Sequence, residues 1–189
     1  MYTNQRNYDE LIEQINKLFG TKNSSTIVLI DIDLFHKTNT HWDNNKKILE
    51  YYHFLKGVTT ANILYLGKDE FGLVYPIGDL NEVMIEIISA KINFHNNFNT
   101  TLSAGIAAYP KQGEDYVEII RNLEDSLYQA KLDGRDKILI ADNKKLKLKS
   151  NYYTPIQLSR LNKLSEKLQR SEASLLREAL DEIFRKYES

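Results

Sequence analysis

The sequence predicts a mixed α+β fold, an α/β sandwich in which helices cover a mainly antiparallel sheet. Continuous apolar runs such as TIVLIDID are typical of strands that are buried inside a sheet. Segments with apolar residues at helical spacing alternate with these runs. The stretch LYLGKDEFGLVYP, residues 64–76, places two such runs around a short polar tip, which indicates a β-hairpin.

The predicted elements follow one another in the order of a βαββαβ core, after one additional helix. That first helix is predicted from the apolar spacing between Tyr8 and Phe19, with Gly20 as its C-terminal cap. The strands are predicted in four places: residues 26–33, both arms of the hairpin in 63–76, 100–110 and 137–141. Helical spacing lies between them, over residues 44–56, 80–88 and 116–130.

The chain changes character after Ala141, so we expect a domain at 1–141, a basic linker at 142–148 and a second domain at 149–189. The second domain has two helical patterns with no strand between them, and Ser171 or the residue before it is the predicted N-cap of the second. About forty residues cannot bury this much apolar helix surface alone. The segment is therefore expected to pair, most simply with its own copy in a homodimer.

Composition excludes several classes of protein. The 189 residues contain no cysteine, which leaves neither a disulfide framework nor a thiolate metal site. No apolar run approaches the length of a membrane helix, and the first residues lack a signal peptide's apolar core, so we expect a cytoplasmic protein without a membrane partner. The formal net charge of −1 conceals a local basic stripe, NKKLKLK, at residues 143–149.

Acidic residues gather at the hairpin tip, where Asp69 and Glu70 are expected beside the end of the strand that carries Asp31 and Asp33. Carboxylates that converge from two strands suit Mg²⁺, which binds through one or two carboxylates together with substrate phosphates. The alternative is that the tip acids are solvated turn residues.

The first domain resembles the GGDEF family, the diguanylate cyclases, over roughly residues 4–141. Four segments carry the resemblance, in the family's order: IDIDLFHKTN, LGKDEF, TLSAGIAAYP and SLYQAKLDGRDKI. The resemblance implies that Asp31, Asp69 and Glu70 hold Mg²⁺, with the two tip acids catalytic if the domain is active. It also implies that Lys131 and Arg135, expected on one face at a helix end, reach the triphosphate and that Asn39 contacts guanine; a charged helix terminus is the alternative for the two cations.

Several positions depart from the family pattern. Lys68 stands where the family has a second glycine, which allows the substrate to approach the backbone closely. The lysine side chain could block the nucleotide or neutralise its phosphate. His36 replaces the phosphate-facing lysine, and HWDNNKK replaces the element that reads guanine. The product-inhibition motif R-x-x-D is replaced by VTTA, which predicts no feedback binding of cyclic di-GMP there. We therefore expect nucleotide binding with weak or no cyclase activity.

The C-terminal segment resembles a ribbon-helix-helix DNA-binding domain from Lys147 to about Tyr187, with a short strand that ends at Pro155 and the run SEASLLREAL. Such domains form only as dimers, and a two-stranded ribbon fits the major groove of DNA. The resemblance implies that Lys149, Asn151 and Tyr153 face double-stranded DNA and that the backbone around Ser171 anchors phosphate. The alternative is a helical hairpin used only for dimerisation.

Together these features predict a transcriptional regulator whose degenerate GGDEF-like domain senses a guanine nucleotide, either GTP or cyclic di-GMP. One alternative is an active diguanylate cyclase that makes cyclic di-GMP from two GTP and carries a DNA-binding or dimerising tail. Another is a scaffold regulator that binds no nucleotide. Binding of GTP with Mg²⁺ separates the scaffold from the other two, and turnover separates the cyclase from the sensor.

Overall fold

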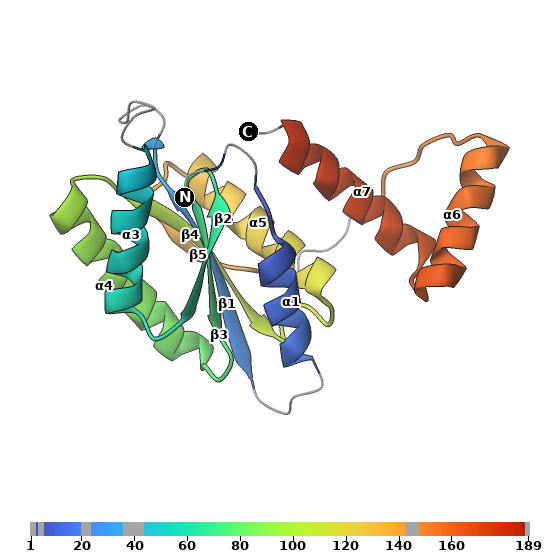
Figure 1. The fold of residues 1–189 in the computed structure, drawn as a ribbon. Helices are drawn as coiled ribbons and strands as arrows, with labels where there is room; N and C mark the ends of the chain where they lie inside the picture. Colours follow the sequence, from blue (N-terminus) through green and yellow to red (C-terminus); the bar gives the residue numbers. More distant parts are fainter. Residues whose placement is uncertain (1–2, 4–5, 20–23, 36–43, 143–147, 188–189) are drawn as a thin grey trace. The chain divides into compact units, whose positions relative to one another are not determined.

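The computed structural model of the chain describes residues 3, 6–19, 24–35, 44–142 and 148–187. The chain divides into two compact units, Met1–Asn143 and Lys144–Ser189, drawn in Figure 1. None of the helices in these described ranges combines the length and the hydropathy that crossing a bilayer demands.

The first unit is built on one five-stranded sheet, among the residues described, with the strand order β2-β3-β1-β4-β5. All neighbouring strands are antiparallel except β4 and β5, which are parallel. The mixed α+β fold and the mainly antiparallel sheet are therefore confirmed. The strands are β1 (Ser25–Ile32), β2 (Asn62–Gly67), β3 (Glu70–Tyr75), β4 (Leu102–Tyr109) and β5 (Ile138–Ile140).

Helices cover both faces of the sheet, as Figure 1 shows. One face packs against α3 and α4, and the other packs against α1 and α5. Because β1 lies between two helical layers, all eight of its residues are buried, which explains its continuous apolar run. The bounds of these helices are α1 (Asp9–Leu18), α3 (Asn44–Val58), α4 (Leu80–Phe98) and α5 (Tyr116–Leu132).

The helix ends differ from the predicted ones for local reasons. The extended backbone of Phe19 ends α1, and the predicted cap Gly20 lies outside the described residues. The helix α4 runs ten residues beyond its predicted end at Ile88, until Asn99 adopts a left-handed conformation that stops it. Asp79 caps its first turn by accepting hydrogen bonds from the backbone N–H groups of Asn81 and Glu82.

Close packing of α5 on β4 depends on Gly105. A Cβ atom at this position would lie 2.5 Å from the carbonyl oxygen of Leu123 and 2.9 Å from the backbone nitrogen of Leu127. Both atoms belong to the helix backbone, which cannot turn away as a side chain can. The glycine therefore sets how closely α5, which carries Lys131, approaches the sheet.

The second unit consists of α6 (Pro155–Leu168) and α7 (Glu172–Tyr187). Thr154 caps α6 in a capping box with Gln157, and Pro155 occupies the first helical position. The Ser171 hydroxyl accepts a hydrogen bond from the backbone N–H of Ser174, which confirms Ser171 as the cap of α7. Residues 148–154 form no strand in the single chain, and a ribbon strand would need a second chain to pair with.

The two helices of the second unit leave most of their apolar side chains in solvent. Tyr187 is 71% exposed and Ile183 is 52% exposed, and the helices bury only Leu175. The other side chains of this exposed surface are Ile156, Leu158, Leu164, Leu168, Leu176, Leu180 and Phe184. Two helices with this much apolar surface cannot supply a sufficient core alone.

Candidate functional site

The hairpin tip brings the predicted acids together at one edge of the sheet. Asp31, near the end of β1, stands directly opposite Glu70, the first residue of β3. Asp69 adjoins them, and its carbonyl accepts a hydrogen bond of 3.0 Å from the backbone N–H of Ile32. The three acids are almost inaccessible to solvent, at 4%, 2% and 9% exposure for Asp31, Glu70 and Asp69. They are therefore buried acids and not solvated turn residues.

Lys131 reaches this cluster from the last turn of α5. Its Nζ atom donates to Asp31 Oδ2 at 2.5 Å. Burial raises the pKa of Asp31 to about 8, because Lys131 only partly offsets the loss of water and the neighbouring Asp69 and Glu70 raise the pKa further. The lysine thus lies where it can meet either the carboxylate or the phosphates of a ligand.

Glu70 is held by two residues that the sequence analysis did not single out. Arg6 Nη2 lies 2.5 Å from Glu70 Oε1, and the Tyr8 hydroxyl donates to Glu70 Oε2 at 3.1 Å. Burial raises the pKa of Glu70, against the opposing effects of Arg6 and Lys131. Arg6 is the only arginine in the first 120 residues, which makes it noticeable in the sequence. Its isolation does not identify Glu70 as its partner. Both oxygens of Glu70 are therefore occupied by the protein itself.

Asp33 has a structural role at the same edge of the sheet. Its carboxylate accepts hydrogen bonds from the hydroxyls of Thr101 and Ser103, at 2.7 and 2.8 Å, and from the backbone N–H of Asp136 at 3.0 Å. These bonds tie the end of β1 to the start of β4 and to the turn before β5. With its lone pairs used in this way, Asp33 is a poor candidate for a metal ligand.

Lys68 forms the tip of the hairpin with a left-handed backbone, φ = 52°, after Gly67 at φ = 104°. Its backbone N–H donates to the carbonyl of Thr3 at 2.8 Å, and its carbonyl accepts from the Tyr65 hydroxyl at 2.9 Å. Burial lowers the pKa of Lys68, and the nearby charge of Arg6 lowers it further. The backbone is thus fixed in a conformation that favours glycine, while an ammonium group stands beside the acids.

Arg135 does not share a helix face with Lys131, contrary to our expectation. The helix α5 ends at Leu132, and Gly134, Arg135 and Asp136 follow in a left-handed turn with φ values of 106°, 63° and 53°. Arg135 is exposed, and the structure describes no ion pair for its side chain. Its reach toward a triphosphate stays a prediction. Asn39, the predicted guanine contact, lies outside the described residues, as do His36 and Lys37.

The acids fit a divalent cation through Asp31 and Asp69 but not through all three predicted ligands. Within the described residues, the Asp69 carboxylate has no hydrogen bond or ion pair, although the residue is 9% exposed. Asp31 uses one oxygen for Lys131, and Glu70 uses both oxygens for Arg6 and Tyr8. No group of three or more possible ligand residues is poised around an ion in the described part of the chain. Two carboxylates with substrate phosphates are a typical Mg²⁺ environment.

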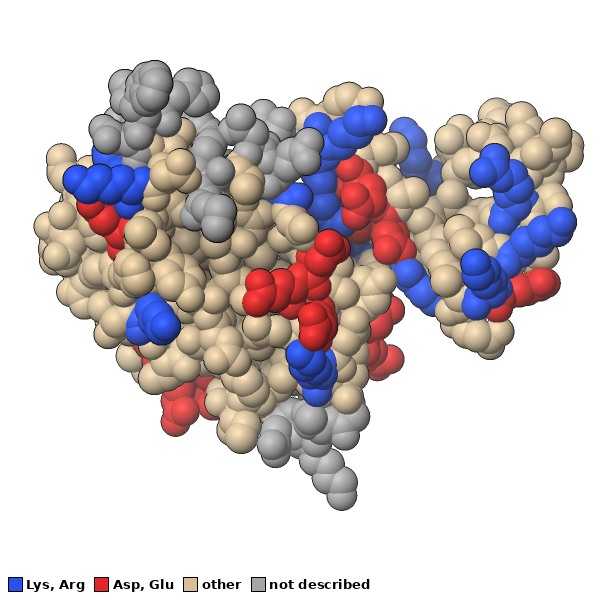
Figure 2. All heavy atoms as spheres, viewed as in Figure 1, with Lys and Arg blue, Asp and Glu red and all other residues tan. Residues whose placement is uncertain are grey.

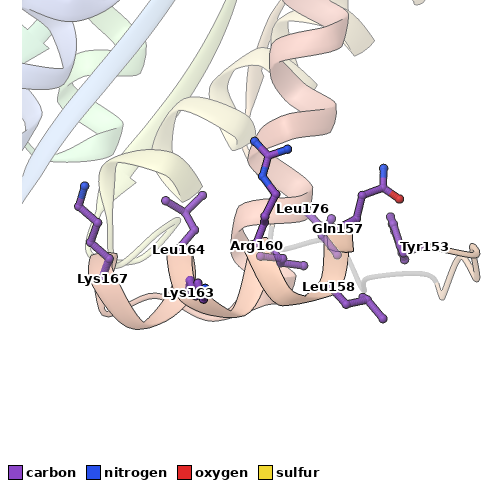
Figure 3. A pocket seen from close by; sticks show the side chains of 9 residues that line it. Tyr153, Gln157, Leu158, Arg160, Lys163, Leu164, Lys167 and Leu176 are labelled. Carbon is purple, nitrogen blue, oxygen red and sulfur yellow. The ribbon is translucent and has the colours of Figure 1, made fainter. Parts of the chain in front are cut away.

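The predicted DNA-facing residues lie on the segment that leads into α6. Lys149 and Asn151 are exposed, and Tyr153 is 40% exposed. Tyr153 lines a groove of about 540 Å³ together with Leu158, Leu164 and other side chains of α6, as Figure 3 shows. A DNA-facing Tyr153 requires a ribbon of two paired strands, and a single chain does not contain such a ribbon. The contact of Tyr153 with DNA therefore stays a prediction.

Comparison with known proteins agrees with this architecture. The family model for the diguanylate cyclase GGDEF domain matches residues 54–137. No curated protein sequence is significantly similar to the chain. Several solved structures share the fold of its first unit. Their sequence identities to this chain are low, so they establish a similar fold and nothing more.

Three of these structures illustrate the similarity. The active GGEEF domain of a diguanylate cyclase from Vibrio cholerae aligns with a TM-score of 0.58 and 19% identity, over 70% of this chain and 90% of its own. The GGDEF domain of YfiN from Pseudomonas aeruginosa aligns with a TM-score of 0.60 and 17% identity, over 71% and 91%.

The GGDEF domain of DgcB from Caulobacter crescentus, solved in complex with cyclic di-GMP, aligns with a TM-score of 0.58 and 19% identity, over 70% and 86%. The family match includes the hairpin tip and the turn that carries Arg135. Residues 54–137 thus match the GGDEF family model, and the first unit has the fold of solved GGDEF domains.

Proposed function

We propose that the first unit binds a guanine nucleotide with Mg²⁺ at the hairpin tip, with little or no turnover, and that the second unit binds DNA as a ribbon-helix-helix dimer. The observation that carries the nucleotide proposal is the arrangement of Asp31, Asp69 and Lys131. One buried carboxylate without a described partner stands beside a carboxylate and lysine pair, so both a cation and a phosphate find an opposite charge within one small site.

Each residue of the tip has a separate task in this proposal. Mg²⁺ would neutralise the phosphate charge and would be held by Asp31 and Asp69. With a cation bound to the carboxylate of Asp31, Lys131 would be free to donate hydrogen bonds to the phosphates. Arg6 and Tyr8 position Glu70 and do not touch the nucleotide.

Lys68 is the reason for proposing a sensor. It places an ammonium and four methylene groups at the tip of the hairpin, where the family has a glycine. A nucleotide can meet the ammonium electrostatically, but it cannot approach the tip backbone as closely as glycine allows. Catalysis depends on reacting atoms held within a narrow range of distances, so a shifted phosphate lowers turnover more than binding.

The second candidate function is a diguanylate cyclase. It is favoured by the tip acids, which remain in place, and by the family match through the hairpin. The two candidates are separated by incubating the full chain with GTP and Mg²⁺ and separating the products by chromatography, with a reaction lacking metal as the control. Cyclic di-GMP formed at a rate well above that control establishes the cyclase, and bound but unchanged GTP supports the sensor.

The DNA-binding half of the proposal is supported by the geometry of the second unit. The capping box at Thr154 fixes the point at which residues 148–154 end and α6 begins, so this segment leads directly into the first helix of the pair. Exposed apolar faces on both helices require a partner, and pairing of two such segments would form a ribbon of the width that the major groove accepts.

The test is fluorescence anisotropy of the full chain with a random-sequence duplex library at low salt, followed by selection of the bound sequences. Replacing Asn151 and Tyr153 together by alanine should weaken binding to the selected duplex and relax its sequence preference. Asn162→Ala, at an exposed position of α6, is the matched control. Equal affinity of the double variant and the control would leave the second unit as a dimerisation hairpin only.

A further inference from the structure

The turn that follows α5 has a strained backbone. Gly134 has a φ of 106°, and it is followed by Arg135 and Asp136 with φ values of 63° and 53°. The left-handed region is open to glycine but unfavourable for a residue with a Cβ atom. Strained residues of this kind persist only where the surrounding structure holds them, and they gather at functional sites. The contacts that hold this turn are therefore of functional interest.

Backbone hydrogen bonds fix the turn at the edge of the sheet that carries the acids. The Asp136 N–H donates to the buried Asp33 carboxylate at 3.0 Å. The Arg135 N–H donates to the carbonyl of Ala130 in α5, also at 3.0 Å. Asp33 follows Asp31 by two residues, which span no more than about 7 Å. The turn and the acids of the hairpin tip therefore lie at the same edge of the sheet.

A lysine from the other side of the sheet binds the same turn. Lys91 of α4 pairs with the Asp136 carboxylate, with 2.7 Å between Nζ and Oδ1. Helix α4 packs on one face of the sheet, whereas α5 packs on the other. Asp136 thus bonds to the end of β1 through its backbone and to α4 through its side chain. Three elements, α4, α5 and the end of β1, together fix the turn that carries Arg135.

The exposure of this ion pair indicates where it acts. The side chain of Lys91 is 19% exposed and that of Asp136 is 49% exposed. Because water screens a pair that is this exposed, the pair adds little to the stability of the whole fold. Its effect is local: it favours one backbone conformation at Asp136 and the residue before it. The direction in which the Arg135 side chain leaves the turn depends on that conformation.

The direction of Arg135 matters for a phosphate ligand. Its side chain is exposed, and a guanidinium binds phosphate oxygens in a fixed planar geometry, so a change of direction loses hydrogen bonds. The chain has a formal net charge of −1, and Figure 2 shows basic side chains of the first unit at several places but no broad basic surface in this view. Phosphate binding therefore depends on the placement of single cations.

We infer that Lys91 is a positioning residue for the phosphates of the bound nucleotide, and that it acts through Asp136 on the direction of Arg135. Lys91 itself does not touch the ligand, because its ammonium is paired with Asp136. The inference rests on the proposed nucleotide site. Lys131 meets the phosphates from the last turn of α5, and Arg135 meets them from the turn that follows.

The test is the affinity of the full chain for GTP with Mg²⁺, measured by isothermal titration calorimetry in a double-mutant cycle. The variants are Lys91→Met, Arg135→Ala and the two combined. Lys91→Arg is the conservative variant that retains the ion pair. The matched control is Lys17→Met, which removes an ion pair of the same length, 2.7 Å to Glu13, from α1. Circular dichroism checks that each variant is folded.

We expect Lys91→Met to weaken GTP binding about fivefold, and Arg135→Ala to weaken it at least as much. In the Arg135→Ala background, Lys91→Met should cause no further loss, because the side chain through which it acts is absent. Lys91→Arg should retain most of the parent's affinity. Lys17→Met should bind like the parent.

Three results would overturn the inference and leave the nucleotide site standing. They are unchanged binding by Lys91→Met, unchanged binding by Arg135→Ala, and an equal loss from Lys91→Met with and without Arg135. The last of these would show that Lys91 acts on the fold rather than on the arginine. If the parent does not bind GTP, the nucleotide site itself is wrong, and the inference is wrong with it.

Discussion

The ammonium of Lys131 lies 2.5 Å from the carboxylate of Asp31, although 100 residues separate them in the chain. This ion pair joins the last turn of α5 to the end of β1 beside the hairpin tip. The pair also leaves one uncompensated acid in the cluster. Lys131 neutralises Asp31, whereas the carboxylate of Asp69 has no partner among the residues described.

The pair of Lys131 and Asp31 should show strong energetic coupling. Lys131→Met leaves a buried carboxylate without its partner, and because the lysine side chain is 24% exposed we expect a loss of about 2 kcal/mol rather than the full cost of a broken buried pair. Adding Asp31→Asn removes the unpaired charge and should restore most of the loss. Urea denaturation of the two single variants and the double variant measures the coupling, and simple additivity would contradict it.

Arg6 should stabilise the hairpin tip through Glu70. Arg6→Ala removes an ion pair whose side chains are 18% and 2% exposed, and we expect it to reduce the free energy of unfolding by about 2 kcal/mol. Tyr8→Phe removes one hydrogen bond and leaves the ion pair, so its cost should be about 1 kcal/mol. Chemical denaturation ranks the two, and an Arg6→Ala variant as stable as the parent would show that the pair contributes nothing.

Lys68→Gly should change ligand behaviour with little change in stability. Glycine removes the strain of the left-handed backbone, which should increase the free energy of unfolding by about 1 kcal/mol. It also gives the unfolded chain more conformational freedom, which lowers that free energy by a similar amount, so the two effects nearly cancel. Lys68→Ala keeps the backbone strain and removes the charge, which separates the two roles. Nucleotide affinity and turnover are measured for both variants. If Lys68→Gly leaves affinity and turnover unchanged, Lys68 is not what distinguishes this domain from a cyclase.

Gly105→Ala should destabilise the first unit. The added methyl group meets the backbone of α5 at Leu123 and Leu127 together with the side chain of Ser126, and overpacking of this kind costs about 1–3 kcal/mol. Gly57→Ala, in α3 with no atom within 4 Å of the new Cβ, is the control and should be neutral or stabilising. Thermal melting of both variants gives the comparison, and equal melting temperatures would contradict it.

The sequence was sufficient for the fold of the first unit because its strands and helices differ sharply in apolar period. The run at β1 has no polar alternation because helices cover both of its faces, and Gly67 and Pro76 flank the second arm of the hairpin. The meeting of Asp31 with Asp69 and Glu70 was predictable as well, since each lies at the end of a strand in the same sheet.

Other parts of the site depend on contacts that no local pattern encodes. Arg6 and Tyr8 come from a segment before α1, and Tyr8 meets Glu70 across 62 residues of sequence. Arg135 was placed on the helix by its spacing, but the left-handed turn at Gly134 takes it beyond the helix end. The ribbon strand of the second unit needs another chain, so neither one sequence nor one folded copy contains its hydrogen bonds.

The most direct test of the central claim is the binding of GTP to the full chain with and without Mg²⁺, measured by isothermal titration calorimetry. We expect binding that requires Mg²⁺ and that Asp69→Asn weakens at least about tenfold, since it removes a carboxylate ligand from the metal. Asp125→Asn, an exposed acid of α5, should bind like the parent. Equal Mg²⁺-dependent affinity for the parent and Asp69→Asn, or no binding by the parent, would contradict a nucleotide site at the hairpin tip.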